Sequence, residues 1–338
     1  MMKKRIVLLM PLLFGCGSDG GEPTLPTEEP VLQGLSIGVS DAPIDDVTAV
    51  VLKFDRIILT PAGAMGGGYH GNGPLVLELA NHHVDMLQFQ EDASHWLLND
   101  EQLPVGRYDV RIEVLAGSGD QGSYVDDAQG RHPLYMVQNH INVGEIDIQE
   151  DGEHSYTLEL DLRQSLHYDP ETGYSLLYSG LRWVDNRTMG HLMGSIDSTW
   201  VEGCEADNAA LADEAGQFSH VAYLYPSGTT LEAMDDMAAE PESGRVAPIA
   251  TSYVHQVMDG TWRFGMGFLP QGEYQVGYSC LGHLDLPESN ETGAESFAIY
   301  GDGGTVVIDA GSGGGYRNGH HCGGRGPGGG PWGPGNRG

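Results

Sequence analysis

The sequence contains few cysteines and almost no lysine. Four cysteines occur in 338 residues, and none belongs to a C-x-x-C pair, the pattern of thioredoxin-type redox sites and of haem attachment. The H-E-x-x-H pattern of zinc proteases and the lysine-containing P-loop are also missing. No apolar run approaches the roughly 20 residues that a transmembrane helix needs. These gaps argue against thiol redox, zinc-protease and P-loop functions and against a membrane-spanning helix.

The N-terminus has the three-part layout of a secretory signal. Two lysines and an arginine precede the short apolar run 6–14, and Gly15 precedes Cys16. Such a run is too short to span a bilayer. The tetrapeptide Leu13-Phe14-Gly15-Cys16 resembles the lipobox of bacterial lipoproteins. The resemblance implies cleavage of signal 1–15, acylation of Cys16 with palmitate or a related chain, and, with Gly17 next, an outer-membrane location. An ordinary cleaved signal with a chance cysteine is the alternative.

Both ends of the mature chain are low in complexity. Residues 16–33 hold three prolines and four acids with little to bury, which predicts a disordered, lipid-anchored tether. Residues 311–338 hold fourteen glycines and no acid. Glycine at this density loses too much backbone entropy on folding, so we predict a disordered tail.

The charge is strongly negative. The full chain has 16 Lys+Arg and 48 Asp+Glu, a formal net charge of −32. Three positive residues leave with the signal and three lie in the tail, so residues 16–310 hold 10 against 48, or −38. A field of this sign repels nucleic acid, which argues against DNA and RNA as partners. It suits either divalent cations or solubility in saline water, and we favour solubility.

Strand signals predict an all-β fold with two domains. Tyr108, Val110, Ile112 and Val114 alternate with polar residues, as in a half-buried antiparallel strand. Helical signal in the first half is limited to 93–101. The 277 residues between tether and tail exceed one typical domain. We predict two antiparallel β-sandwiches in tandem, at 34–186 and 190–310.

A short motif occurs in both halves of the chain. Leu103-Pro-Val-Gly-Arg-Tyr-Asp-Val recurs as Leu269-Pro-Gln-Gly-Glu-Tyr-Gln-Val. Proline fixes φ at the turn and glycine permits positive φ. Tyr108 and Tyr274 then begin a strand, where each can bury its ring and return its hydroxyl to the backbone, as tyrosine corners do in sandwiches.

Four motifs in the first half resemble a known family. Ser40-Asp41-Ala42-Pro43, Leu103–Tyr108, Asp161-Leu-Arg-Gln-Ser-Leu166 and Gly180-Leu-Arg-Trp-Val-Asp185 occur in this order. Residues 34–186 thus resemble the bacterial domain of unknown function numbered 4382, which is common in secreted lipoproteins. The resemblance implies a β-sandwich and supplies no catalytic residues.

The second half resembles a known fold more loosely. Phe268–Tyr278 is similar to a strand of the transthyretin-like or carboxypeptidase-regulatory-like sandwich. Two acidic, alanine-rich stretches, 205–216 and 231–240, are expected as short helices or loops between strands. That family is mostly structural or adhesive, which bears on function only by analogy.

The remaining three cysteines divide into a pair and a single thiol. Cys204 follows the first expected strand of the second domain, and Cys280 ends the strand that begins near Tyr274. In an oxidising compartment two cysteines of one sandwich often pair, so we predict a Cys204–Cys280 disulfide; two buried free thiols are the alternative. Cys322 in the tail is then the free thiol.

Two groups of residues are candidate metal ligands. Asp41, Asp45 and Asp46 surround an expected turn and could hold Ca²⁺, although turn chemistry explains Asp41 equally well. His320, His321 and Cys322 could bind copper or zinc. We expect no cofactor, with Ca²⁺ as the alternative at the first group.

Two further alternatives concern ligands and catalysis. Trp96, Trp183, Trp200 and Trp262 could form a carbohydrate platform, against buried or strand-edge roles. Asp161, Arg163, Ser165 and His167 alternate on one expected strand and could suggest a hydrolase. Side chains two apart on a strand run parallel and give no triad, so we expect Arg163 to form a structural ion pair with Asp161 or Asp185.

We therefore predict a non-enzymatic lipoprotein of the cell envelope that acts as a binding or scaffolding module. It is held to the outer membrane by its lipid, facing the periplasm or the outside, with an envelope protein or glycan as partner. A metal- or carbohydrate-binding surface protein is the first alternative, and an unrecognised hydrolase is the second.

Overall fold

Paired strands make up most of the chain in this computed structural model. It describes residues 30–42, 47–62, 73–90, 93–117, 122–178, 180–237, 243–285 and 297–310. Most strand pairs are antiparallel, whereas β1 with β9 and β7 with β11 are parallel. The all-β prediction is confirmed. The predicted tail lies outside the described residues, as does most of the predicted tether; β1 begins two residues inside the latter, at Leu32.

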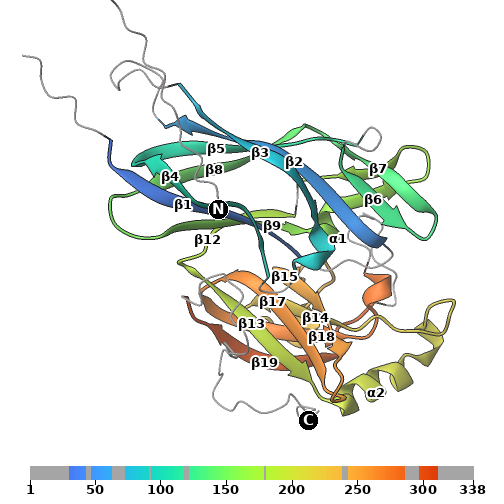
Figure 1. Cartoon of the computed structure of the whole chain (residues 1–338). Helices are drawn as coiled ribbons and strands as arrows, with labels where there is room; N and C mark the ends of the chain where they lie inside the picture. Colours follow the sequence, from blue (N-terminus) through green and yellow to red (C-terminus); the bar gives the residue numbers. More distant parts are fainter. Residues whose placement is uncertain are drawn as a thin grey trace, which may run out of the picture. The chain divides into compact units, whose positions relative to one another are not determined.

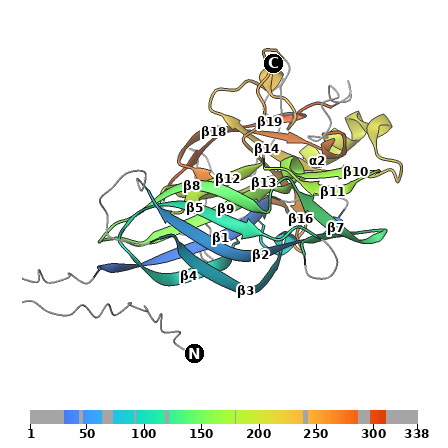
Figure 2. The ribbon, with the colours of Figure 1, turned by 90° about the horizontal axis from the view of Figure 1, so that it is seen from above.

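The first half of the chain forms two sheets, coloured blue to green in Figure 1. Sheet I has the order β12 (Leu181–Asp185), β9 (His154–Asp161), β1 (Leu32–Ala42) and β4 (His95–Pro104). Sheet II has the order β10 (Leu166–Asp169), β11 (Gly173–Leu176), β7 (Gly130–Met136), β6 (Tyr124–Asp127), β2 (Val47–Pro61), β5 (Gly106–Val114) and β8 (His140–Ile148), with β3 (Leu75–Asp85) also on β2. Figure 2 shows β10, β11 and β7 at one end of sheet II.

The second half forms two smaller sheets. Sheet III has the order β13 (Met189–Ile196), β17 (Trp262–Pro270) and β16 (His255–Gln256). Sheet IV has the order β15 (Ala250–Tyr253), β14 (Val221–Pro226), β18 (Gly272–Ser279) and β19 (Gly301–Ile308). The helices are α1 (Leu162–Ser165) and α2 (Ser198–Asp207), with 3₁₀ turns η1 (Met86–Gln88), η2 (Ala209–Leu211), η3 (Leu231–Ala233) and η4 (Gly282–Leu284). Within the described residues, no helix is long and apolar enough to cross a membrane.

Alternating side chains of facing sheets fill each core. On β5, Tyr108, Val110, Ile112 and Val114 are buried while Asp109 and Arg111 are exposed, as the periodicity predicts. The first core lies between sheets I and II, and the second lies between sheets III and IV. We call these pairs of sheets the first and the second sandwich.

Strand β14 is buried on both faces. Ala222 and Leu224 belong to the second core, whereas Val221, Tyr223 and Tyr225 pack with Met234 and Ile299 in a separate cluster on the other face of sheet IV. A continuous apolar run, Val-Ala-Tyr-Leu-Tyr, is what a strand covered on both faces requires.

The repeated motif makes the same corner in both sandwiches. In the first it joins β4 of sheet I to β5 of sheet II, and in the second it joins β17 of sheet III to β18 of sheet IV. The Tyr108 hydroxyl donates to the Pro104 carbonyl at 2.8 Å, and the Tyr274 hydroxyl donates to the Pro270 carbonyl at 2.7 Å. The predicted tyrosine corners are therefore present, and each one carries the chain between the two sheets.

The helical signal at 93–101 was misleading. Residues 95–104 form β4, whose backbone pairs with β1 at the edge of sheet I. Pairing with β1 and burial of Leu97 and Leu98 outweigh the local preference. In the second half, α2 begins at Ser198, before the acidic stretch, so Cys204 lies on a helix and not directly after a strand.

Candidate functional site

The D-L-R-x-S motif leaves the sheet where β9 ends. Asp161, the last residue of β9, caps the single turn α1, and its side chain accepts from the Gln164 amide at 3.4 Å. The turn breaks the strand, so Arg163 and Ser165 do not alternate along it. Arg163 is buried, and burial of a guanidinium demands a partner.

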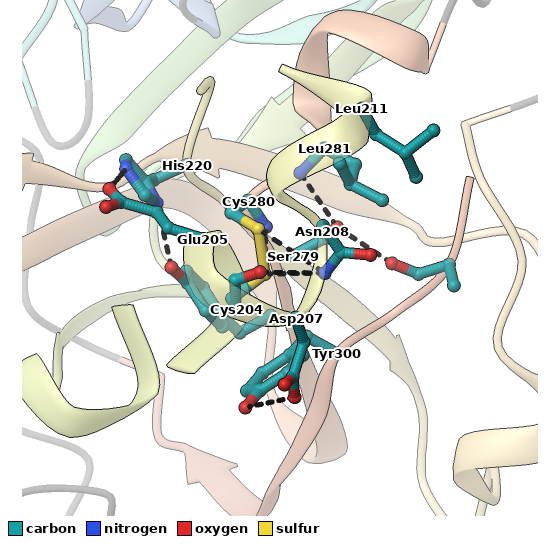
Figure 3. The surroundings of a disulfide bond; sticks show 12 residues. Cys204, Glu205, Asp207, Asn208, Leu211, His220, Ser279, Cys280, Leu281 and Tyr300 are labelled. Atoms are coloured by element: carbon teal, nitrogen blue, oxygen red, sulfur yellow. Dashed lines mark hydrogen bonds and ion pairs between the residues drawn. A yellow bond between two sulfur atoms is a disulfide. The ribbon is translucent and has the colours of Figure 1, made fainter. Parts of the chain in front are cut away.

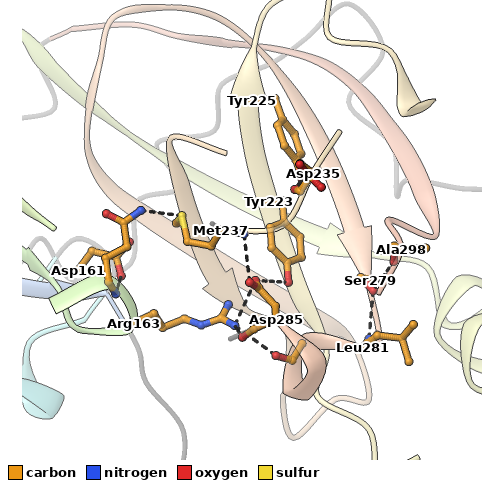
Figure 4. Close-up of polar contacts among 12 residues, drawn as sticks. Asp161, Arg163, Tyr223, Tyr225, Asp235, Met237, Ser279, Leu281, Asp285 and Ala298 are labelled. Atoms are coloured by element: carbon orange, nitrogen blue, oxygen red, sulfur yellow. Dashed lines mark hydrogen bonds and ion pairs between the residues drawn. The ribbon is translucent and has the colours of Figure 1, made fainter. Parts of the chain in front are cut away.

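Arg163 finds its partner in the second sandwich (Figure 4). Its Nη2 lies 3.2 Å from an Asp285 carboxylate oxygen and also donates to the carbonyls of Gly282 and Asp285 at 3.2 and 3.1 Å. Its Cζ lies 5.6 Å from the centre of the Tyr253 ring. Burial alone would lower the pKa of Arg163, but the Asp285 carboxylate and the other acidic groups around the guanidinium together outweigh burial and raise that pKa, so the arginine stays charged.

Asp285 collects donors from three segments. Besides Arg163, its carboxylate accepts the Tyr223 hydroxyl at 2.8 Å and the Met237 amide at 3.0 Å, as Figure 4 shows. The side chain of Asp285 is 1% exposed, so these contacts must compensate for nearly all of the hydration that its carboxylate loses on burial. Burial, together with the adjacent Asp285 charge, raises the pKa of Tyr223 well above its ordinary value, which keeps the phenol a donor. We call Arg163, Tyr223 and Asp285 the inter-sandwich lock.

The lock corrects two sequence expectations. Arg163 does form a structural ion pair, but with Asp285 and not with Asp161 or Asp185; Asp185 pairs with Arg187 at 2.6 Å. The prediction that Asp161, Arg163, Ser165 and His167 alternate on one strand was wrong. Asp161 caps α1, Arg163 and Ser165 lie in α1, and His167 lies in β10. The residues therefore give no catalytic arrangement.

A second buried charge lies on the face of sheet I that turns away from its core. Ser40, Glu159 and Arg182 are cross-strand neighbours on β1, β9 and β12, and Arg182 forms an ion pair with Glu159. Burial raises the pKa of Glu159 to about 7, although the Arg182 charge opposes the shift. Glu159 therefore changes charge near neutral pH. The only signal of this in the sequence is an acidic residue within an apolar strand.

The disulfide joins α2 to the end of β18 (Figure 3). Cys204 and Cys280 are bonded as predicted and are both fully buried. The Cys280 amide donates to the Cys204 sulfur at 3.2 Å, and Asn208 caps the end of α2 by donating to the Cys204 carbonyl at 2.8 Å. The bond thus fastens α2 onto sheet IV.

A polar chain runs beside the disulfide. A Glu205 oxygen lies 3.2 Å from His220 Nε2, and His220 Nδ1 lies 2.8 Å from the Tyr278 hydroxyl. Figure 3 shows Glu205 and His220 facing each other. Burial lowers the pKa of His220, against the opposing influence of Glu205, so the ring is neutral over a wider pH range than in water. Tyr278 is fully buried, so we assign this row of hydrogen-bonded side chains a packing role.

A cavity of about 280 Å³ opens in the first sandwich. Its walls include residues of β8, an edge strand of sheet II, and of β12, an edge strand of sheet I, so it lies where the two sheets part. The residues that carry polar or aromatic side chains here are Gln138, His140, Asn142, Tyr178 and Trp183. The structure thus offers a small pocket bordered by residues that carry polar side chains.

The four tryptophans do not form one platform. Trp200 and Trp262 pack in or against the second core, whereas Trp183 packs against the first. Trp183 alone among them lines the cavity, with its ring stacked on Tyr156 at 5.3 Å between centres. Sequence reasoning included Trp183 among the carbohydrate candidates but could not separate it from the other three.

Of the candidate metal ligands, the structure describes Asp41 alone. Asp41 is buried within β1 and not in a turn after it. Asp45, Asp46, His320, His321 and Cys322 lie outside the described residues. Among the residues that are described, no group of three or more His, Cys, Asp or Glu side chains could hold a metal ion.

Two motif spacings escaped the sequence analysis. Gly34-Leu-Ser-Ile-Gly38 has the G-x-S-x-G spacing of a nucleophile elbow, but it lies inside β1, where Ser36 Oγ accepts the Asp100 amide at 3.0 Å. The G-x-G-x-x-G spacing of residues 117–122 follows β5 and leads into β6, not into the helix that a dinucleotide site requires. Neither spacing has the structural context of its function.

Comparisons with known proteins give one family match. Residues 34–177 match the model described as domain of unknown function (DUF4382), which confirms the resemblance of the first sandwich. No curated protein matches the chain.

Two solved structures are similar over most of the chain. A candidate adhesin from Bacteroides ovatus is 10% identical, with 86% of this chain and 80% of that chain covered and a TM-score of 0.18. A major pilin protein (T-13) from Streptococcus pyogenes is also 10% identical, with 74% and 84% covered and a TM-score of 0.17. Similarities at these TM-scores carry no argument about function.

Proposed function

We propose that this chain is a non-enzymatic lipoprotein of the cell envelope that holds two sandwiches as one binding module. The observation that carries the proposal is the inter-sandwich lock. In the charged motif Asp161-Leu-Arg163 of the first sandwich, Arg163 forms an ion pair with Asp285 of the second, and Asp161 caps the helical turn that holds Arg163. A buried charge pair with further hydrogen bonds fixes relative orientation, as a rigid carrier of a binding surface requires.

The anchor in this proposal is Cys16. Its support is the lipobox-like Leu13-Phe14-Gly15-Cys16 and the charged, then apolar, segment before it. Several acyl chains together give stable membrane attachment, since each buried CH₂ contributes about 0.8 kcal/mol. The acidic folded part would be repelled by anionic lipid, so we propose that the lipid, and not surface charge, holds the chain at the outer membrane.

Metabolic labelling with an alkyne palmitate tests the anchor. We expect label on the full chain, loss of label in Cys16→Ser, and retention in the matched control Cys322→Ser. The amount of the Cys16→Ser variant in the membrane fraction should fall to the same extent as its label. Labelling that persists in Cys16→Ser, or that disappears in Cys322→Ser, would contradict the proposal.

Site-specific photo-crosslinking in living cells tests the binding module. Val137 is 72% exposed and precedes Gln138 of the cavity, whereas Met258 is fully exposed on the second sandwich. We expect a photoreactive residue at 137 to capture an envelope component that position 258 does not, and only in the anchored chain. Equal capture from both positions would argue against a dedicated surface on the first sandwich.

A further inference from the structure

The cavity of the first sandwich has an uncharged lining. Among the described residues around it, none is Asp, Glu, Lys or Arg, although the chain as a whole has 64 such residues. An ionic ligand would gain no partner here and would lose its hydration. The ligand that suits the cavity is therefore neutral.

The lining is nevertheless rich in hydrogen-bonding groups. Three of the lining residues carry hydrogen-bonding side chains: Gln138 and Asn142 have amides that both donate and accept, and His140 has an imidazole. Leu158 and Leu181 provide the apolar floor from sheet I. A site with these groups favours a ligand that carries hydroxyls on an otherwise apolar frame.

Trp183 adds a second, independent observation. Its indole Nε1 is buried and has no hydrogen-bond partner among the described residues. A buried tryptophan N–H usually has one, because leaving it unpaired costs free energy. Tyr156 stacks on the ring with the two planes 2° apart, and Tyr156 does not line the cavity. Trp183 thus combines a ring fixed by stacking with an unpaired donor, in a residue that lines the cavity.

We propose that this cavity binds a single neutral sugar ring of an envelope glycan. The proposal rests on the proposed function and names its ligand. The sugar hydroxyls pair with the amides of Gln138 and Asn142 and with Trp183 Nε1, while the C–H face of the ring packs on apolar and aromatic side chains. Pockets for drug-sized ligands span about 300–1,000 Å³, so 280 Å³ suits about one ring.

A peptide segment is the competing occupant, since β8 and β12 are edge strands that could pair with a further strand. A peptide side chain that enters between two sheets meets the core, and an apolar lining would receive it best. Here three of the lining residues carry polar side chains, and a tryptophan donor is unpaired among the described residues. These groups favour the sugar.

Isothermal titration of the purified mature chain with neutral hexasaccharides tests the proposal. The probes are the β-1,4-glucan, α-1,4-glucan, β-1,4-mannan and β-1,4-xylan hexamers, with oligogalacturonate as the charged counterpart and an alternating valine–threonine hexapeptide as the strand probe. We expect at least one neutral hexamer to bind and the galacturonate not to bind.

Three variants locate the site. Asn142→Ala and Trp183→Phe each remove one ligand hydrogen bond, so we expect about a tenfold loss of affinity from each. Gln149→Ala is the matched control, because Gln149 is an exposed amide just beyond the same strand, and it should leave binding unchanged. Circular dichroism confirms that each variant is folded.

Three results would overturn the proposal: no neutral hexamer binds, binding survives both Asn142→Ala and Trp183→Phe, or only the hexapeptide binds. Each of these leaves palmitate labelling at Cys16 and crosslinking from position 137 unaffected. Failure of the sugar is therefore distinguishable from failure of the envelope module itself.

Discussion

The two sandwiches share a corner and differ in how they are fastened. Each passes from one sheet to the other through the same L-P-x-G-x-Y turn, with the tyrosine hydroxyl on the proline carbonyl. Among the described residues, the first sandwich has 30 in its buried core, and its sequence has no cysteine. The described part of the second has 19 in its inner core and a disulfide. A smaller core that carries a crosslink is the expected compensation where less apolar surface is buried.

Loss of the lock should strongly destabilise the chain. Arg163→Met leaves Asp285 buried without its charge partner, so we expect a loss of about 3–5 kcal/mol in the free energy of unfolding. Arg263→Met is the matched control: its pair with Asp259 is exposed and should contribute under about 1 kcal/mol. Urea titration of the mature chain measures both. Equal losses would show that burial of the lock has no energetic consequence.

Reduction of the disulfide should destabilise the second sandwich and leave the first unchanged. The bond closes a loop with a sequence separation of 76 residues, which corresponds to about 4 kcal/mol in the chain-entropy model and to less in many measured cases. We expect amides of β18 to lose hydrogen-exchange protection in dithiothreitol while amides of β5, at the same corner of the first sandwich, keep theirs.

Thiol counting supplies the control for that experiment. The denatured, unreduced mature Cys322→Ser variant should show no free thiol, against one in the parent, whose Cys16 sulfur carries lipid. Two extra thiols in either protein, or equal loss of protection in β5 and β18, would contradict the assignment.

Acidity should act on the two sandwiches in opposite directions. The pKa of Glu159 is about 7 in the folded chain and 4.5 in water, so the folded state binds more protons between these values and stability falls as pH rises through them. The pKa of His220 is lowered from 6.5 by burial. The unfolded state then binds more protons below 6.5, and stability falls as pH drops.

Two variants measure the contributions of Glu159 and His220 separately. Glu159→Gln should raise the free energy of unfolding at pH 8 by up to about 3 kcal/mol relative to its effect at pH 4, since one pKa unit corresponds to about 1.4 kcal/mol. His220→Gln should remove the loss of stability that His220 causes below pH 6.5. Urea midpoints across pH measure both. A Glu159→Gln effect that is constant from pH 4 to 8 would show that Glu159 does not titrate in this range.

The corners could be predicted from sequence because their causes are local. Proline, glycine and tyrosine within six residues specify the turn and the returning hydroxyl, and two copies made the pattern distinctive. The disulfide was predictable for a similar reason: only two cysteines fell within the second expected domain.

The lock and the cavity could not be predicted, because both depend on packing between distant segments. Arg163 and Asp285 are 122 residues apart, and no local pattern specifies which surfaces of two sandwiches meet. Asp161 and Asp185 were nearer in sequence but are engaged elsewhere, in a helix cap and with Arg187. The cavity depends on where sheets I and II part, which strand periodicity does not reveal.

The smallest expected effect tests whether the two corners are equivalent. Tyr108→Phe and Tyr274→Phe each remove one hydroxyl and leave the ring, so each should cost about 1 kcal/mol, the net contribution of a typical hydrogen bond. The surroundings match closely: a Cβ at Gly106 or Gly272 would lie 3.5 Å from the ring of the following tyrosine in both cases. Thermal melts of the two variants, with the exposed Tyr135→Phe as control, give the comparison. A loss at Tyr274 well above that at Tyr108 would mean that the smaller core of the second sandwich depends more heavily on its corner, and that the shared motif carries different shares of stability in the two places.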